Sequence, residues 1–206
     1  MLAYRVWGLV LNDLGELRLG SIGRPGIWEV EAEAYCDLRS GLVADHLRDK
    51  RLWRHECGLY AFKTISWAMD ICWGWGYEYI PGAVQVFGTV LETEFGYRVT
   101  NAYIEALFEY PWPCDFCRGE AKAIYMAPFP SFHPVRFVCP RCLATGHPTQ
   151  LEAGILTPQW QGVDRRIVFP RPGEEIVAKG EVYNQLGKYY RVPVVSYEVL
   201  RKAGWD

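Results

Sequence analysis

The hydrophobic and polar positions at the start of the chain predict a β-hairpin. Residues 3–10 are mostly apolar and β-prone, residues 12–15 form a turn sequence, and residues 16–22 alternate leucines with polar neighbours. In contrast, residues 27–56 are charge-rich and irregular, with weak helical spacing only over 42–49. We therefore expect a loop-dominated segment after the hairpin.

Periodic patterning returns at Gly58. Residues 59–62 have the composition of a short buried strand, and apolar positions over residues 65–72 have helical spacing. Residues 84–91 and 97–108 are rich in β-branched and aromatic side chains, which predicts two strands joined by a tight turn. This region therefore predicts a sheet and one helix as the core of the N-terminal part.

The second half of the chain follows the stiff sequence Pro111-Trp112-Pro113. Its β-prone, turn-rich composition predicts short strands and a final helix that Ser196 can cap. The predicted strands are residues 121–126, 135–138, 166–169, 175–183 and 189–195, and the predicted helix is 196–202.

Composition narrows the class of protein. Of the 206 residues, half are hydrophobic and 15% are aromatic, and the formal net charge is -2. These values are typical of globular proteins and exclude the disordered, collagen-like and coiled-coil classes. Because no apolar run approaches the roughly 18 residues of a membrane span and no secretory signal is evident, we expect a cytoplasmic protein without a membrane partner. The sequence leaves the oligomeric state open.

Four of the seven cysteines form two Cys-x-x-Cys pairs, Cys114 with Cys117 and Cys139 with Cys142, separated by 21 residues. Each pair can direct two thiolates from one turn onto a tetrahedral ion, and the strands predicted between the pairs complete the layout of a zinc ribbon. The expected cofactor is a structural zinc, because four thiolates leave no open coordination position. Iron, a redox pair or four buried free cysteines are the alternatives. We expect the nearby residues His133 and His147 outside the coordination sphere.

Together these patterns predict an α+β fold that is mostly β, with an antiparallel sheet, one or two short helices and an inserted zinc ribbon. The expected parts are an N-terminal β-rich part, residues 1–110, and the ribbon, residues 111–146. The remaining residues, 147–206, are expected to form strands and a short helix that pack with the N-terminal part.

A second candidate zinc site lies in the loop-dominated segment. Its four ligands would be Cys36, His46, His55 and Cys57, all of them residue types that bind zinc. A metal would order a segment of about 30 residues that has little apolar periodicity. The alternative is that the cysteines are small buried hydrophobic residues and the histidines are solvated.

Two segments of the chain resemble a group of known proteins. They are residues 57–63, Cys-Gly-Leu-Tyr-Ala-Phe-Lys, and residues 86–103, which include Gly-Tyr-Arg-Val. The region from about residue 28 to 108 resembles a group of uncharacterised bacterial, phage and plasmid proteins with a Cys-x-Cys-Gly-Ile-Tyr-Ala motif and a later Gly-Tyr-Arg-Ala motif. The resemblance implies an origin in phage or mobile elements but no activity. His55 replaces the first cysteine of the doublet, and histidine also binds zinc.

One basic cluster is interleaved with aromatic residues. Basic side chains beside aromatic rings can bind the phosphates and stack on the bases of single-stranded nucleic acid. The alternative is a solvated helix face next to tryptophans that pack in the core or in loops. The residues of this candidate surface are Arg48, Lys50, Arg51, Trp53, Arg54, Trp73, Trp75 and Tyr77.

These observations favour a non-enzymatic, zinc-stabilised binding or adaptor module whose partner is a protein or a nucleic acid. Phosphate-binding loops, nucleophile elbows and metalloprotease motifs are absent from the sequence, so no catalytic residue is predicted. The alternative is an enzyme that acts on nucleic acid or nucleotides. It would use two or more of the side chains of Glu92, Glu94, Arg98 and Glu105, provided that they converge in a pocket.

Overall fold

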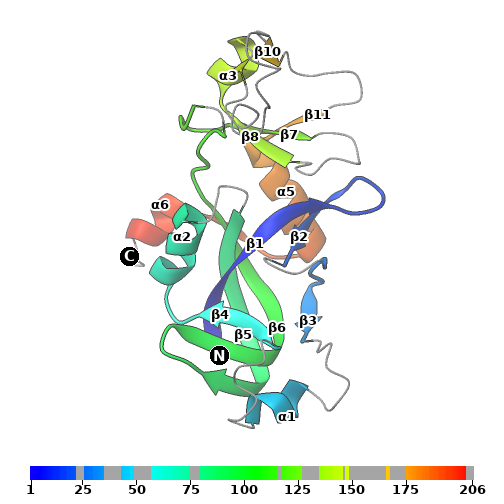
Figure 1. The fold of residues 1–206 in the computed structure, drawn as a ribbon, viewed down its shortest axis with the longest axis vertical. Coiled ribbons are helices and arrows are strands. Elements are labelled where there is room, and N and C mark those ends of the chain that lie inside the picture. The colour runs from blue at the N-terminus through cyan, green and yellow to red at the C-terminus, as the bar shows by residue number, and fades with distance from the viewer. Residues whose placement is uncertain are drawn as a thin grey trace, which may run out of the picture. The chain divides into compact units, whose positions relative to one another are not determined.

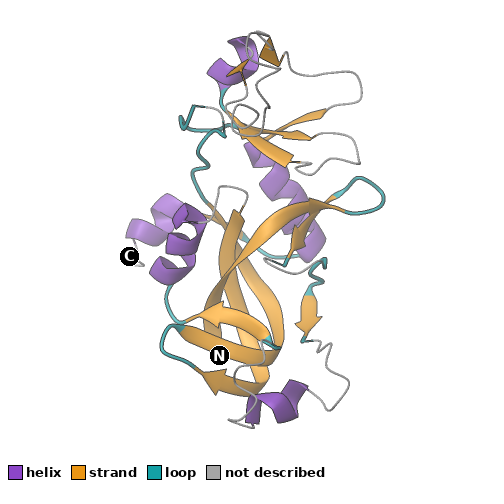
Figure 2. Ribbon diagram, viewed as in Figure 1, coloured by secondary structure: helices purple, strands orange, loops and turns teal. Residues whose placement is uncertain are grey.

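The computed structural model describes residues 1–21, 26–34, 43–48, 57–74, 79–115, 117–126, 135–145, 147–148, 166–167 and 175–202 (Figures 1 and 2). In these residues the fold is mostly antiparallel β-sheet with a few helices, as the sequence predicts. The chain divides into two compact units: unit 1 is Met1–Tyr110 with Tyr183–Asp206, and unit 2 is Pro111–Val182. Within the described ranges, no helix has the length and apolar composition needed to cross a bilayer.

Strands β1 (Leu2–Leu11) and β2 (Leu17–Gly20) form the predicted hairpin at the start of unit 1. In its turn, the side-chain oxygen of Asn12 accepts hydrogen bonds from the backbone N–H groups of Leu14 and Glu16, at 3.0 and 2.8 Å. An asparagine side chain that takes the place of backbone partners in this way stabilises a tight turn.

Strands β5 (Tyr79–Glu92) and β6 (Gly96–Glu109) form a hairpin at the two positions where the sequence predicts shorter strands. Its register shifts twice, between Ala83 and Val84 and again between Phe87 and Val90. Gly88, in the second shift, has a φ of 78°, which residues other than glycine rarely adopt. Such bulges bend the strands, so the hairpin can curve within the sheet.

The pairings of unit 1 form a closed ring of four strands. β1 pairs with β5, β5 with β6, and β6 with β4 (Leu59–Phe62), while β4 returns to β1 through the pair Tyr4 and Phe62. β3 (Glu31–Glu33) and β12 (Val194–Ser196) also pair with β6, β12 in the parallel direction. Because β5 occupies one edge of β6, these short strands and β4 share its other edge.

Large side chains fill the core of unit 1. Trp7 is fully buried, and its ring centroid lies 5.5 Å from that of Trp28 in an edge-to-face arrangement. The guanidinium of Arg5 is buried 4.3 Å from the centroid of the Trp28 ring and donates a hydrogen bond to the Tyr60 carbonyl. Burial lowers the pKa of Arg5 from its ordinary value. Further buried side chains of this unit include Leu19, Ile80, Val84, Val86, Leu107 and Phe108.

Helices α1 (Val43–Arg48), α2 (Ile65–Gly74) and α6 (Tyr197–Lys202) belong to unit 1, together with the C-terminal part of α5 (Lys179–Tyr190). The Tyr190 hydroxyl accepts a hydrogen bond from the Leu19 N–H and donates one to the Trp28 carbonyl, both at 2.9 Å. These two bonds attach the end of α5 to the N-terminal segment.

The sequence-based prediction missed the helix that lies within residues 175–195. It placed strands at 175–183 and 189–195, whereas the structure has β11 (Glu175–Ala178), helix α5 and then the short strand β12. The buried side chains of α5 recur at helical spacing. They are β-branched or aromatic at three of four positions, and this β-prone composition concealed the period. The four positions are Val182, Tyr183, Leu186 and Tyr190.

Unit 2 contains a three-stranded antiparallel sheet with the order β11-β7-β8. β7 is Ala123–Met126, within the strand predicted at 121–126, and β8 is Val135–Val138, as predicted. Helix α3 (Pro140–Thr145) follows β8, and the short strands β9 (His147–Pro148) and β10 (Arg166–Ile167) pair with each other. The cysteine pairs therefore flank a small sheet.

Candidate metal centre

The first cysteine pair lies in a tight turn that precedes β7. The Cys114 N–H donates to the Gly119 carbonyl at 2.6 Å, and the Arg118 N–H donates to the Cys114 carbonyl at 2.9 Å. Arg118 has a φ of 64°, a left-handed conformation that is uncommon for a residue other than glycine. The chain therefore reverses directly after Cys117 and closes the turn around the two thiols.

The second pair lies at the junction between β8 and α3. Cys139 follows the last residue of the strand, and Cys142 lies in the first turn of the helix. Pro140 begins the helix, a position where the missing N–H removes no intrahelical bond. The Cys142 N–H donates to the Cys139 sulfur at 3.4 Å, and the Leu143 N–H donates to the Cys139 carbonyl at 3.0 Å. The start of the helix therefore fixes both thiols.

Asp115 connects the first turn to the strand that carries the second. Its carboxylate accepts a hydrogen bond from the Phe137 N–H at 2.7 Å, and its own N–H donates to the Phe137 carbonyl at 2.9 Å. The Phe137 ring packs 4.3 Å from the Trp112 ring, centroid to centroid. Sequence reasoning did not identify this support. The available signal was an aspartate next to the first cysteine, because its short side chain readily bonds nearby backbone N–H groups.

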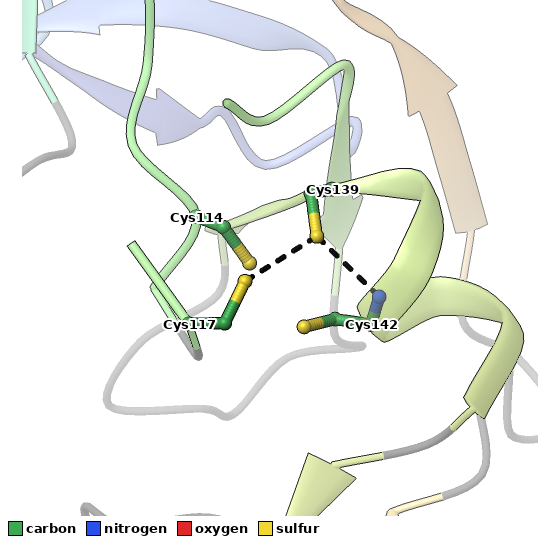
Figure 3. A group of neighbouring side chains, drawn as sticks. All are labelled: Cys114, Cys117, Cys139 and Cys142. Carbon is green, nitrogen blue, oxygen red and sulfur yellow. Dashed lines mark hydrogen bonds between the residues drawn. The ribbon is translucent and has the colours of Figure 1, made fainter. Parts of the chain in front are cut away.

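The four sulfur atoms converge from these two turns (Figure 3). All four lie within 4.8 Å of one another, and those of Cys117 and Cys139 are 3.5 Å apart. Cys117 is exposed, whereas Cys114, Cys139 and Cys142 are buried. A disulfide would require an S–S distance near 2.05 Å, and all four cysteines are free.

The environment of the thiols favours negative charge on one sulfur. Burial alone would raise the pKa of the Cys139 thiol. Hydrogen bonds from the Cys142 N–H and from the neighbouring thiols outweigh the effect of burial, so the pKa is lowered to about 7. Burial and the neighbouring thiols raise the pKa of Cys142. A site that stabilises a thiolate among further thiols matches the ligand that zinc requires.

The geometry fits a tetrahedral ion. With Zn–S bonds of about 2.3 Å, tetrahedral sulfurs lie about 3.8 Å apart, so the observed cluster needs only a small contraction. The cysteines predicted from the sequence are therefore brought together, and this cluster could hold a metal ion. Its four thiolates complete a tetrahedral shell, which is typical of structural rather than catalytic zinc.

The second predicted metal site stays a prediction. Cys36 and His55 lie outside the described residues, and His46 lies in α1, where only its backbone is described. Cys57 is 1% exposed and packs with Val43 and Leu47. The described residues therefore do not test whether the four side chains meet.

Most of the predicted basic and aromatic surface also lies outside the described residues. Arg48, in α1, is exposed and forms an ion pair with Asp45 at 3.5 Å. Trp73 lies in α2, where its side chain is not described. The residues outside the description are Lys50, Arg51, Trp53, Arg54, Trp75 and Tyr77. The proposed nucleic-acid surface therefore remains untested.

The four residues of the alternative catalytic site do not converge. Arg98 is buried and donates to the Cys57 carbonyl from Nε at 3.1 Å. Glu92 is exposed and pairs with Lys63 at 2.7 Å, whereas Glu94 and Glu105 are exposed in the turn and at the far end of β6. Seven residues of an extended strand span about 23 Å, which separates Arg98 from Glu105.

Comparisons with family models, with curated proteins and with solved structures give no match for this chain.

Proposed function

We propose that this protein is a non-enzymatic binding module in which one zinc ion, held by Cys114, Cys117, Cys139 and Cys142, stabilises unit 2. The convergence of four free thiols from two tight turns supports this proposal. The described part of unit 2 has small sheets of three and two short strands, and a metal can supply folding free energy that so small a core lacks.

The binding role is supported by the side chains of unit 1. Several large aromatic side chains are exposed there, and tyrosine, tryptophan and phenylalanine provide much of the binding energy in protein interfaces. The exposed set includes Tyr60, Trp67, Phe87, Phe95 and Tyr103. The dispersion of Glu92, Glu94, Arg98 and Glu105 gives no support to an enzyme that relies on them.

Elemental analysis of the purified chain, together with an anomalous-scattering map on both sides of the zinc absorption edge, tests the metal. We expect at least one zinc per chain and a peak between the four sulfurs. Cys142→Ser should lose that zinc. Cys72→Ser should keep it, because Cys72 lies in α2, outside both cysteine groups.

Each result discriminates between the interpretations. A peak at the iron edge alone would assign a different metal, and a metal-free cluster in protein that was never exposed to chelator would contradict the proposal. Two zinc ions per chain would support the second site at Cys36, His46, His55 and Cys57.

A further inference from the structure

One face of the unit 1 sheet presents aromatic side chains between carboxylates. Residues directly opposite in antiparallel strands point to the same face. Glu31 is opposite Tyr103, which is opposite Gln85, and Gln85 is opposite Leu2. In the next row Glu33 is opposite Asn101, which is opposite Phe87. We call these seven residues the β3–β6–β5 face.

The face is open in the described part of the chain. Leu2, Phe87 and Tyr103 are 44%, 37% and 40% exposed, and the rings of Phe87 and Tyr103 lie 6.1 Å apart. The intervening residues on the same strands point to the core, where Val86 and Ala102 are each 1% exposed. The face is therefore the outer surface of a well-packed sheet, which positions its side chains firmly.

Carboxylates border the aromatic pair. Glu31 and Glu33 are exposed on β3, and Glu105, the extra residue at a register shift in β6, is exposed beside them. Ion pairs of these three glutamates are absent from the part of the chain that the structure describes. The N-terminal ammonium is nearby, where it donates to the Val86 carbonyl at 2.9 Å.

The same unit shows how such a set of groups binds a cation. The guanidinium of Arg18 lies 3.7 Å from the centroid of the Tyr189 ring and pairs with the Glu16 carboxylate at 2.5 Å. The Arg18 guanidinium also donates to the Leu17 carbonyl at 2.8 Å, so one tyrosine ring, one glutamate and one carbonyl hold this arginine. Tyr103 and Glu31, directly opposite each other on the outer face, offer the same two side-chain groups.

We infer that the β3–β6–β5 face binds an arginine- or lysine-rich segment of a partner protein. The cationic groups would stack on Tyr103 and Phe87 and pair with Glu31, Glu33 and Glu105, while apolar parts of the segment contact Leu2. Carboxylates repel phosphates, so the charge of this face disfavours nucleic acid. This inference rests on the proposed function, because it names the partner class of the binding module.

Binding is measured by fluorescence anisotropy with the full zinc-loaded chain and a labelled peptide that alternates arginine and leucine. A glutamate–leucine peptide and a single-stranded oligodeoxythymidylate of similar length are the comparison probes. Of the three probes, we expect only the arginine peptide to bind, with an affinity that falls as the salt concentration rises. Tyr103→Ala should weaken it about threefold or more, as should Glu31→Gln with Glu33→Gln, since each cation contact contributes a factor of a few.

Two variants control for folding and for general charge. Tyr103→Phe keeps the ring and should keep most of the affinity. Glu94→Gln with Glu198→Gln removes two exposed carboxylates elsewhere on unit 1 and should leave binding unchanged. Equal weakening by this control pair would overturn the inference, because it would reveal attraction by net charge alone. Failure of the arginine peptide to bind, or direct binding of the labelled oligonucleotide to the chain, would also overturn it.

Zinc content is measured on every sample before the titration. Zinc-loaded chain that does not bind the arginine peptide contradicts only the partner class. Chain that contains no metal at the four cysteines contradicts the proposed function, whatever the peptide does.

Discussion

The two units differ in what holds them together. Unit 1 closes a ring of strand pairings around large buried side chains such as Trp7, Phe108 and Leu107. In unit 2 the larger described sheet has three short strands, and three cysteines of one cluster are buried beside apolar side chains such as Trp112 and Phe137. Hydrophobic burial stabilises the first unit through its own side chains, whereas the second should depend on an added ion.

Removal of the metal should produce the largest difference between the two units. Structural zinc in small domains contributes on the order of 10 kcal/mol, so a chelator or Cys142→Ser should unfold unit 2. Amide hydrogen exchange should then show loss of protection in β7 and β8 but not in β5 and β6. Loss of protection in both units at once would show that they unfold together, and Cys72→Ser is the matched control.

The converse experiment weakens unit 1. Trp7 is fully buried, and Trp7→Ala should cost about 3–5 kcal/mol through lost contacts and the cavity that remains. The denaturant concentration at which β5 and β6 lose protection from amide hydrogen exchange should fall, while one zinc stays bound at the four cysteines. Release of zinc by this variant would contradict the independence of the two units.

Asp115 allows a finer test within unit 2. Asp115→Ala leaves the Phe137 N–H without its side-chain acceptor, which should cost about 1–3 kcal/mol and speed zinc transfer to a competing chelator. Asp115→Asn keeps an acceptor oxygen and should behave closer to the original chain. Equal transfer rates for the alanine variant and the original chain would show that this contact does not support the metal centre.

The smallest expected effect is a pH dependence in unit 1. Burial raises the pKa of Tyr190 to about 12, even though the Leu19 N–H bond opposes the shift. Between about pH 10 and pH 12 the unfolded chain loses this proton before the folded chain does, so stability falls as pH rises. Tyr190→Phe should reduce this fall in stability, as a comparison of denaturant midpoints near pH 9 and pH 11 would show. An unchanged slope would assign the alkaline loss to other tyrosines.

Local signals explain what the sequence predicted well. The bounds of the strands at Leu59–Phe62 and Val135–Val138 and the turn within each cysteine pair depend on a few neighbouring residues, although only Ala61 of the first strand is buried. Cys-x-x-Cys pairs specify a site because the spacing itself fixes the turn. The sequence-based prediction was sufficient where composition and spacing within one short segment agree.

Long-range pairing explains what the sequence did not reveal. The ring closes where Tyr4 meets Phe62, and β12 joins β6 from nearly 90 residues away along the chain. No local period encodes such contacts, because they are fixed by the packing of the whole unit. Likewise, the helix α5 was hidden because its buried residues are β-prone and only their spacing is helical.

The division of the chain also has a consequence for synthesis on the ribosome. Unit 1 is discontinuous, and its contacts include Tyr190 and β12, which follow unit 2 in the chain. The four cysteines emerge earlier, because β12 follows Cys142 by ~50 residues, which take about 3–10 seconds at a synthesis rate of 5–20 residues per second. The nascent chain can therefore bind its metal before β6 of unit 1 can pair with β12.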